Sequence, residues 1–274
     1  MKIKGREDAF QDYTEQVLLC EDSQEGIFTG IYEAYEKKFH SGTVRIVVGE
    51  EREYRLFAVY HKVEPDTEKA LKVARTVSNL TGPEPYRQMC TALSSTDPQK
   101  GQAVFGVIEL LLKDRRSAQR IMDRLADGYV RKVFELHRNV QNEIHHLKEF
   151  LRFQELENKA LFARIGPYND VVMYLMPHFA DRFPQENFMI YDEGRNLLGV
   201  HPASGEWYLA RGVKLDRSML NDSDEEKKYR ELFRFFCHKI AIKERKNLNL
   251  QRNMLPLRFR EFMVEFGEND KNAV

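Results

Sequence analysis

The sequence has few cysteines, a single tryptophan and no long apolar run. Its three cysteines, Cys20, Cys90 and Cys237, lie far apart, which excludes a disulfide framework and a closely spaced iron–sulfur or zinc–thiolate motif. No apolar run approaches the roughly 20 residues that span a membrane, and the first residues lack the apolar core of a signal peptide. We therefore expect a cytoplasmic protein that contacts no membrane and keeps its cysteines as small core residues.

A net charge and the common catalytic motifs are also missing. The 43 Lys and Arg residues balance 43 Asp and Glu residues, so any nucleic-acid surface has to be local rather than a property of the whole chain. The sequence contains no Walker-type phosphate loop, no Gly-rich dinucleotide fingerprint, no nucleophile elbow and no HExxH zinc motif. The sequence by itself therefore assigns no reaction.

What is present indicates a folded α+β protein. The chain has 274 residues, of which 42% are hydrophobic, enough for a substantial core. An apolar run at 13–19, a helical pattern after it, and two β-branched and aromatic runs at 43–48 and 54–60 predict a small N-terminal α/β unit over residues 1–65. Residues 66–128 predict a helical block, because short helical patterns there are separated by Gly and Pro.

The third expected domain, 129–274, begins with the longest helix, 129–155. Its apolar residues recur every three or four positions, and a parallel polar stripe contains His145 and Arg152. Five short apolar runs then predict an antiparallel β-meander, interrupted by a polar loop at 177–187. These runs are 161–165, 171–176, 188–191, 197–200 and 207–209. Basic helices are expected to complete the chain.

Histidines and an aspartate near the end of the long helix form the first candidate site. His145 lies on the polar stripe, and His178 and Asp181 are three residues apart in the following polar loop. These residue types can ligate a metal ion or share protons. The alternative is a structural network of hydrogen bonds along the edge of the helix.

The C-terminal segment is the second candidate, because basic residues concentrate there beside Asn and Gln side chains. Ser223 and Glu226 form a capping box, and Pro256 is placed to begin a last helix. A local excess of positive charge attracts phosphate. The alternative is a solvated helix face, or internal pairing with acidic residues. The basic residues of this segment are Lys243, Arg245, Lys246, Arg252, Arg258 and Arg260.

Three segments together resemble a known family. They are 13–38, the region that contains HFADRF at 178–183, and the region that contains ERKNLNLQRNMLPLR at 244–258. The chain is similar to DNA-metabolism proteins encoded beside a radical-SAM protein that is proposed to modify or repair DNA. A related domain occurs fused to uracil-DNA-glycosylase-like domains. The resemblance implies a radical-SAM partner that holds the iron–sulfur cluster, so no cofactor or metal is assigned to this chain.

The resemblance supplies no catalytic residue, so three functions stay open. We expect an accessory protein of DNA repair or modification that binds DNA, the radical-SAM partner, or both. The first alternative is a metal-dependent hydrolytic or base-processing enzyme centred on His145, His178 and Asp181. The second is a scaffold that only recruits the partner. The residues expected to meet nucleic acid are Arg152, Arg182, Lys243, Arg245, Lys246, Arg252 and Arg258.

Overall fold

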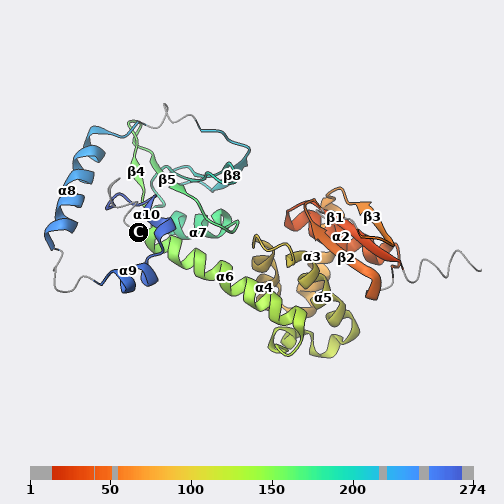
Figure 1. Cartoon of the computed structure of the whole chain (residues 1–274). Coiled ribbons are helices and arrows are strands. Elements are labelled where there is room, and N and C mark those ends of the chain that lie inside the picture. Colours follow the sequence, from red (N-terminus) through yellow and green to blue (C-terminus); the bar gives the residue numbers. More distant parts are fainter. Residues whose placement is uncertain (1–13, 40, 51–54, 216–220, 241–246, 267–274) are drawn as a thin grey trace, which may run out of the picture. The chain divides into compact units, whose positions relative to one another are not determined.

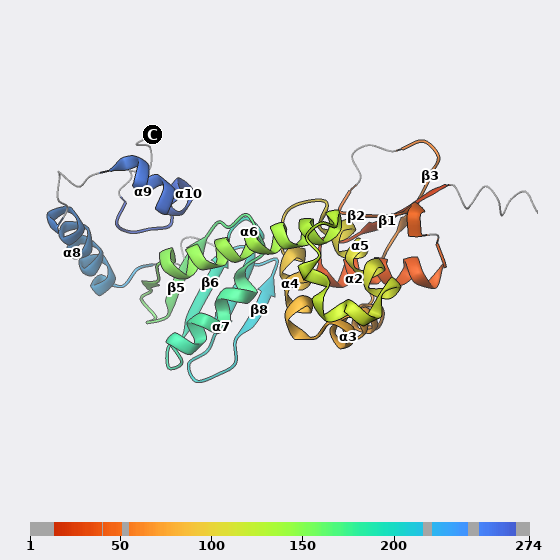
Figure 2. The same ribbon diagram turned by 90° about the horizontal axis from the view of Figure 1, so that it is seen from below.

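The computed structural model describes residues 14–39, 41–50, 55–215, 221–240 and 247–266 (Figures 1 and 2). The chain divides into two compact units, Met1–Gln141 and Asn142–Val274, and the boundary falls inside helix α6, Gly128–Phe150. Each unit combines helices with a β-sheet. The expected α+β class is therefore confirmed, whereas the division into three domains stays a prediction.

The first unit contains a three-stranded parallel sheet. Its strands are β1 (Glu15–Cys20), β2 (Val44–Val48) and β3 (Ala58–Lys62), in the order β2-β1-β3. Helix α2 (Gln24–Glu36) follows β1 and begins where the Ser23 side chain accepts a hydrogen bond from the Gly26 amide. The short 3-10 helix η1 (Ser41–Thr43) precedes β2. The predicted order of strand, helix and two strands is confirmed, but the last strand begins at Ala58, so residues 55–57 of the run predicted at 54–60 precede it.

Helices of the expected helical block pack into the same core. They are α3 (Thr67–Thr81), α4 (Pro83–Leu93), α5 (Lys100–Lys113) and the 3-10 helix η2 (Arg115–Asp123). Buried side chains from the sheet, from α2, from α5 and from the start of α6 belong to one hydrophobic cluster. Its largest members include Phe28, Ile31, Phe105, Leu111 and Ile121.

The long helix α6 ends five residues before the predicted end at 155. After Phe150 the chain becomes extended, and strand β4 (Gln154–Glu155) pairs with β5 (Leu161–Ile165). The polar pattern of the helix continues past Phe150, but strand pairing gives the backbone of Gln154 and Glu155 other partners. Arg152 therefore lies beyond the helix on which it was predicted.

The second unit contains a five-stranded sheet in the order β4-β5-β6-β7-β8. The remaining strands are β6 (Phe188–Asp192), β7 (Leu197–His201) and β8 (Tyr208–Arg211). Three of the four pairings are antiparallel, but β5 and β6 are parallel, with Ile165 opposite Asp192. The prediction of a purely antiparallel meander is therefore wrong, because a helix crosses over between these two strands.

This crossover is helix α7 (Val172–Arg182), where the sequence predicted a strand at 171–176 followed by a loop. A short apolar run is compatible with either a strand or a buried helix, and Pro177 favoured an end at that point. In the structure the helix continues through Pro177. The buried side chains of Val172, Leu175, Met176 and Phe179 recur at helical spacing.

Close packing of α7 on the sheet depends on a glycine in β7. A Cβ atom at Gly199 would lie 2.4 Å from Met176 Sδ and 3.0 Å from Val172 Cγ1. The helix therefore approaches the strand more closely there than a side chain would permit.

The C-terminal region contains α8 (Asp224–Ile240), α9 (Leu248–Met254) and α10 (Leu257–Arg260). Phe259, 3% exposed, has its ring 5.8 Å from the His146 ring and 5.9 Å from the Phe150 ring. Phe262 packs against Gly166 and under the guanidinium of Arg164. These aromatic contacts hold the segment around α10 on the second unit.

Candidate functional site: polar network and exposed helix of the second unit

The structure gives the predicted histidine site no metal-binding arrangement. His145 is 73% exposed, and its Nε2 lies 3.1 Å from Glu149 Oε1 on the same helix. His178 and Asp181 lie on α7 rather than in a loop. Burial, together with Lys148 and Arg182, lowers the pKa of His178, while Asp181 acts in the opposite direction. Within the described ranges, no three His, Cys, Asp or Glu side chains gather closely enough to hold a metal ion.

Two of the arginines predicted to contact DNA pair with buried or partly buried carboxylates. Arg152 donates to Glu265 Oε1 from Nη2 at 2.7 Å and from Nε at 3.2 Å. Arg258 Nη2 lies 3.0 Å from Glu143 Oε1, and its guanidinium lies 4.2 Å from the centre of the Tyr168 ring. In the structure both arginines therefore hold the C-terminal segment in place.

Of the other predicted DNA contacts, some belong to the part of the chain that the structure describes and some lie outside it. Arg182 lies over the ring of its neighbour Phe183, at 5.7 Å. Arg252 lies in the last turn of α9, and among the described residues it forms no ion pair. Lys243, Arg245 and Lys246 lie outside the described residues. The basic surface therefore stays a prediction that depends on Arg182 and on the four residues from 243 to 252.

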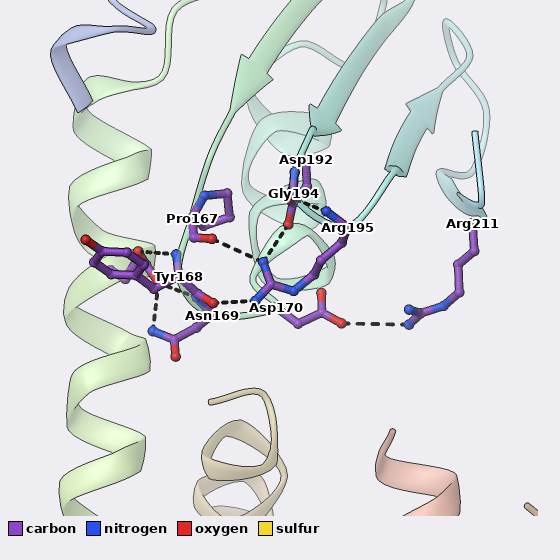
Figure 3. A network of polar contacts seen from close by, with 9 residues as sticks. Pro167, Tyr168, Asn169, Asp170, Asp192, Gly194, Arg195 and Arg211 are labelled. Atoms are coloured by element: carbon purple, nitrogen blue, oxygen red, sulfur yellow. Dashed lines mark hydrogen bonds and ion pairs between the residues drawn. The ribbon is translucent and has the colours of Figure 1, made fainter. Parts of the chain in front are cut away.

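A polar network that the sequence did not predict lies at the carboxyl ends of the parallel strands β5 and β6 (Figure 3). In open α/β sheets this edge is a frequent position for ligand sites. The loop at 166–171 follows β5, and a turn at 193–196 follows β6. Most of the polar groups at this edge are already engaged with one another.

Glu143 of α6 holds the loop after β5. Its side chain is 2% exposed and accepts hydrogen bonds from the amides of Tyr168 at 2.9 Å and Asn169 at 2.8 Å. The side-chain nitrogen of Asn169 donates a third bond at 2.7 Å, and Arg258 completes the set. A buried carboxylate is stable only with such partners, so Glu143 has a structural role.

Asp192 and Arg195 connect the turn after β6 to the same loop (Figure 3). The Asp192 carboxylate is fully buried and accepts from the Gly194 amide at 3.0 Å and from Arg195 Nη1 at 3.0 Å. Arg195 also donates to the carbonyl oxygens of Pro167 and Tyr168. Burial raises the pKa of Asp192, although Arg195 and the backbone bonds oppose that shift.

The network therefore braces the loop after β5 rather than presenting reactive groups. Its two buried carboxylates already have several donors each, as a structural site requires. The exposed features at this edge are the Tyr168 ring and the pair of Asp170 with Arg211, 3.8 Å apart. Glu143 could have been noticed in the sequence, since it lies three residues after Val140 on the apolar stripe of the helix.

Helix α8 carries a row of large apolar side chains that stay exposed. We call this set the α8 face. The exposed fractions are 70% for Tyr229, 62% for Leu232, 40% for Phe233, 56% for Phe236 and 57% for Ile240. Their spacing places them on one side of the helix. The same spacing is present in the sequence, but a stripe of this kind is usually covered by the protein's own core.

The polar side of α8 is attached to the rest of the second unit. Ser223 Oγ accepts from the Glu226 amide at 3.0 Å, which confirms the predicted cap. The carboxylate of Glu226 accepts a hydrogen bond from the Glu155 amide, whereas a complete capping box would have it accept from the Ser223 amide. The Ser223 amide donates to the Glu155 carbonyl instead. Arg230 pairs with Asp222 at 2.9 Å, and Arg234 donates to the Val264 carbonyl. The helix is thus anchored through one side while its apolar side faces solvent.

Residues 98–265 match a protein family described as a domain of unknown function, DUF4130. The chain belongs to the DUF4130 family. The match includes both the polar network and the α8 face, so these are features of the DUF4130 region. No membrane-spanning candidate occurs among the helices of the described ranges, since none is long and apolar enough.

Comparisons beyond this family add little. No curated protein matches the chain. A solved DHH domain, described as a member of the s1p family of ribosomal proteins, is 10% identical. The alignment covers 72% of this chain and 75% of that chain, with a TM-score of 0.28. A similarity this weak is not a basis for assigning a common fold or function.

Proposed function

We propose that this DUF4130 protein is an accessory protein of DNA repair or modification that binds a radical-SAM partner enzyme through the α8 face. The observation that supports binding is the exposure of five large apolar side chains on a capped and anchored helix. The DNA-metabolism setting and the radical-SAM partner come from the sequence resemblance. Exposed apolar patches with polar borders are typical of protein interaction sites.

Burying the apolar side chains of the α8 face provides enough free energy for specific binding. Fully burying one large apolar side chain contributes roughly 1.5–3 kcal/mol, and association has first to offset an entropic cost of at least about 4 kcal/mol. Five such residues on one helix can therefore drive docking into an apolar groove. Recognition of an amphipathic helix in a groove is a recurrent mode of protein binding.

Co-purification tests this proposal directly. The tagged full chain is mixed with the radical-SAM protein encoded beside it, and retention is compared between wild type and the Phe233→Asp, Phe236→Asp double variant. We expect wild type to retain the enzyme and the double variant to lose it. Leu71→Asp is the matched control, because Leu71 is 46% exposed on α3 in the first unit. Equal retention by wild type and the double variant would contradict the proposal.

Nucleic acid is a second candidate for the same helix. Lys227 and Lys228 precede the aromatic residues of the α8 face in the sequence, and Lys239 follows them. Lys239 lies over the ring of Phe235, another exposed residue of the helix, at 5.4 Å. Exposed aromatic rings beside cations form stacking platforms for single-stranded nucleic acid. The acidic residues of the first turn, Asp224 to Glu226, reduce the positive charge there, so partner binding ranks first.

A further inference from the structure

The first unit contains an apolar groove that takes no part in the proposed function. Its volume is about 400 Å³, within the range of roughly 300–1,000 Å³ typical of small-molecule sites. Helices α2, α3 and α5 line it. Its floor consists of buried aliphatic side chains, namely Ile31, Val73, Val77, Ile108 and Leu111.

Polar side chains on the rim of the groove differ in whether they already pair with a neighbouring charge. Glu36 is an acid on the rim, and Lys69 lies 3.5 Å from its carboxylate while also pairing with Glu33 at 3.1 Å. Lys72 is the lysine that lines the groove, and its Nζ lies 5.3 Å from the centre of the Tyr32 ring. Within the described residues Lys72 forms no ion pair.

Tyr35 also lines the groove. Burial, and secondly the carboxylate of Glu109, raises the pKa of Tyr35 to about 12. The phenol therefore keeps its proton at neutral pH and can donate a hydrogen bond. Thr76 is less available as a donor, since its hydroxyl already donates to the Lys72 carbonyl at 2.7 Å. An ammonium group and a phenol thus border an apolar floor.

We propose that this groove binds a small amphipathic carboxylate, such as a medium-chain fatty acid, with its chain on the apolar floor and its carboxylate at Lys72. The apolar floor provides most of the binding free energy, because it removes hydrocarbon from water. The ammonium group of Lys72 selects the sign of the head group, because Glu36, the acid that lines the groove, is already paired with Lys69. Charge complementarity of this kind contributes mainly to specificity.

Three probes with the same ten-carbon chain test the head group. Decanoate, decanol and decyltrimethylammonium are titrated separately into the full-length protein by isothermal calorimetry, below their aggregation concentrations. We expect decanoate to bind with one-to-one stoichiometry and at least about tenfold more tightly than the other two. Equal affinity for decanol, tighter binding of the cation, no binding at all, or a stoichiometry well above one would each overturn the proposal.

Variants then locate the site. Lys72→Glu reverses the charge at the rim and is expected to weaken decanoate binding at least about tenfold, with little effect on decanol. Thr76→Trp places a large ring at the exposed mouth and is expected to remove binding of both. Lys62→Glu on β3 is the matched control, because Lys62 is 80% exposed and does not line the groove. Circular dichroism melting verifies that each variant folds. Unchanged decanoate affinity in folded Lys72→Glu and Thr76→Trp would refute the assignment.

Discussion

Glu143 Oε1 lies 3.0 Å from Arg258 Nη2, so a residue of α6 holds the segment that contains α10. The Glu143 side chain is 2% exposed, and that of Arg258 is 29% exposed. The sequence predicted Arg258 as a DNA contact, whereas its guanidinium faces a protein carboxylate and the Tyr168 ring. The pair connects the loop after β5 to the C-terminal segment.

Replacing Glu143 should therefore destabilise the second unit strongly. Glu143→Ala leaves Arg258 and the Asn169 side chain without their acceptor, and removing one partner of a buried pair costs about 3–5 kcal/mol. Urea unfolding at neutral pH measures the loss. Glu149→Ala is the control, since Glu149 is half exposed and pairs with an exposed His145, and it should change stability by no more than about 0.5 kcal/mol. A loss below about 1 kcal/mol for Glu143→Ala would show that the network is not a brace.

The α+β class and the strands of the first unit followed from local patterns in the sequence. Prediction failed at α7, where the side chains of Val172 and Leu175 are buried on a helix although the run reads equally well as a strand. The parallel pairing of β5 with β6 was missed for the same reason. Without the helix between them, an antiparallel arrangement was the simpler expectation.

The functional residues could be predicted only in part, because pairing partners are set by the tertiary fold. Arg152 and Arg258 have the chemistry of phosphate ligands, but Glu265 and Glu143 reach them from distant positions in the chain. The apolar stripe of α8 was visible in the sequence, but its exposure was not. Exposure depends on what covers a helix, and no local pattern contains that information.

Asp192 should make the protein more stable to unfolding, relative to Asp192→Asn, as the pH falls. Burial raises its pKa above the ordinary value of 3.8, so the folded state binds this proton more tightly than the unfolded chain does. Ionising Asp192 therefore opposes folding above the raised pKa, and this penalty disappears as the pH falls to 3.8. Through that window, wild type should gain stability relative to Asp192→Asn, which cannot ionise.

Urea unfolding at a series of pH values on both sides of 3.8 measures this difference. Asp224→Asn provides a control of opposite sign, because Lys227 lowers the pKa of Asp224. Wild type should lose stability relative to Asp224→Asn as the pH falls towards the lowered value. If the Asp192→Asn difference does not change with pH, or changes in the same direction as the control, the raised pKa is refuted.

Gly199→Ala should destabilise the packing of α7 on β7. The added methyl group would lie 2.4 Å from Met176 Sδ and 3.0 Å from Val172 Cγ1, so at least one of these side chains has to move. Such overpacking typically costs about 1–3 kcal/mol. Chemical denaturation measures the loss, and Gly128→Ala is the control, because a Cβ there meets no atom within 4 Å. Equal effects of the two substitutions would contradict the close approach of α7 to the strand.

The predicted basic surface can be tested through the salt dependence of DNA binding. Each phosphate contact to duplex DNA contributes a slope of about −0.9 in log affinity against log salt concentration. If Lys243, Arg245, Lys246 and Arg252 contact phosphate, changing all four to Ala should weaken binding and flatten this slope. Fluorescence anisotropy with single- and double-stranded oligonucleotides at several salt concentrations gives both quantities.

Arg152→Ala distinguishes the structure from the sequence-based expectation in the same assay. Because the Arg152 guanidinium is held by Glu265, its removal should leave the salt slope unchanged even if it lowers stability. A slope that falls by about one unit in Arg152→Ala would mean that the pair opens to reach phosphate. Absence of DNA binding by wild type, or an unchanged slope in the quadruple variant, would remove the basic segment as a DNA contact. In that event the α8 face could still dock the partner enzyme, since its apolar side chains act independently of these charges.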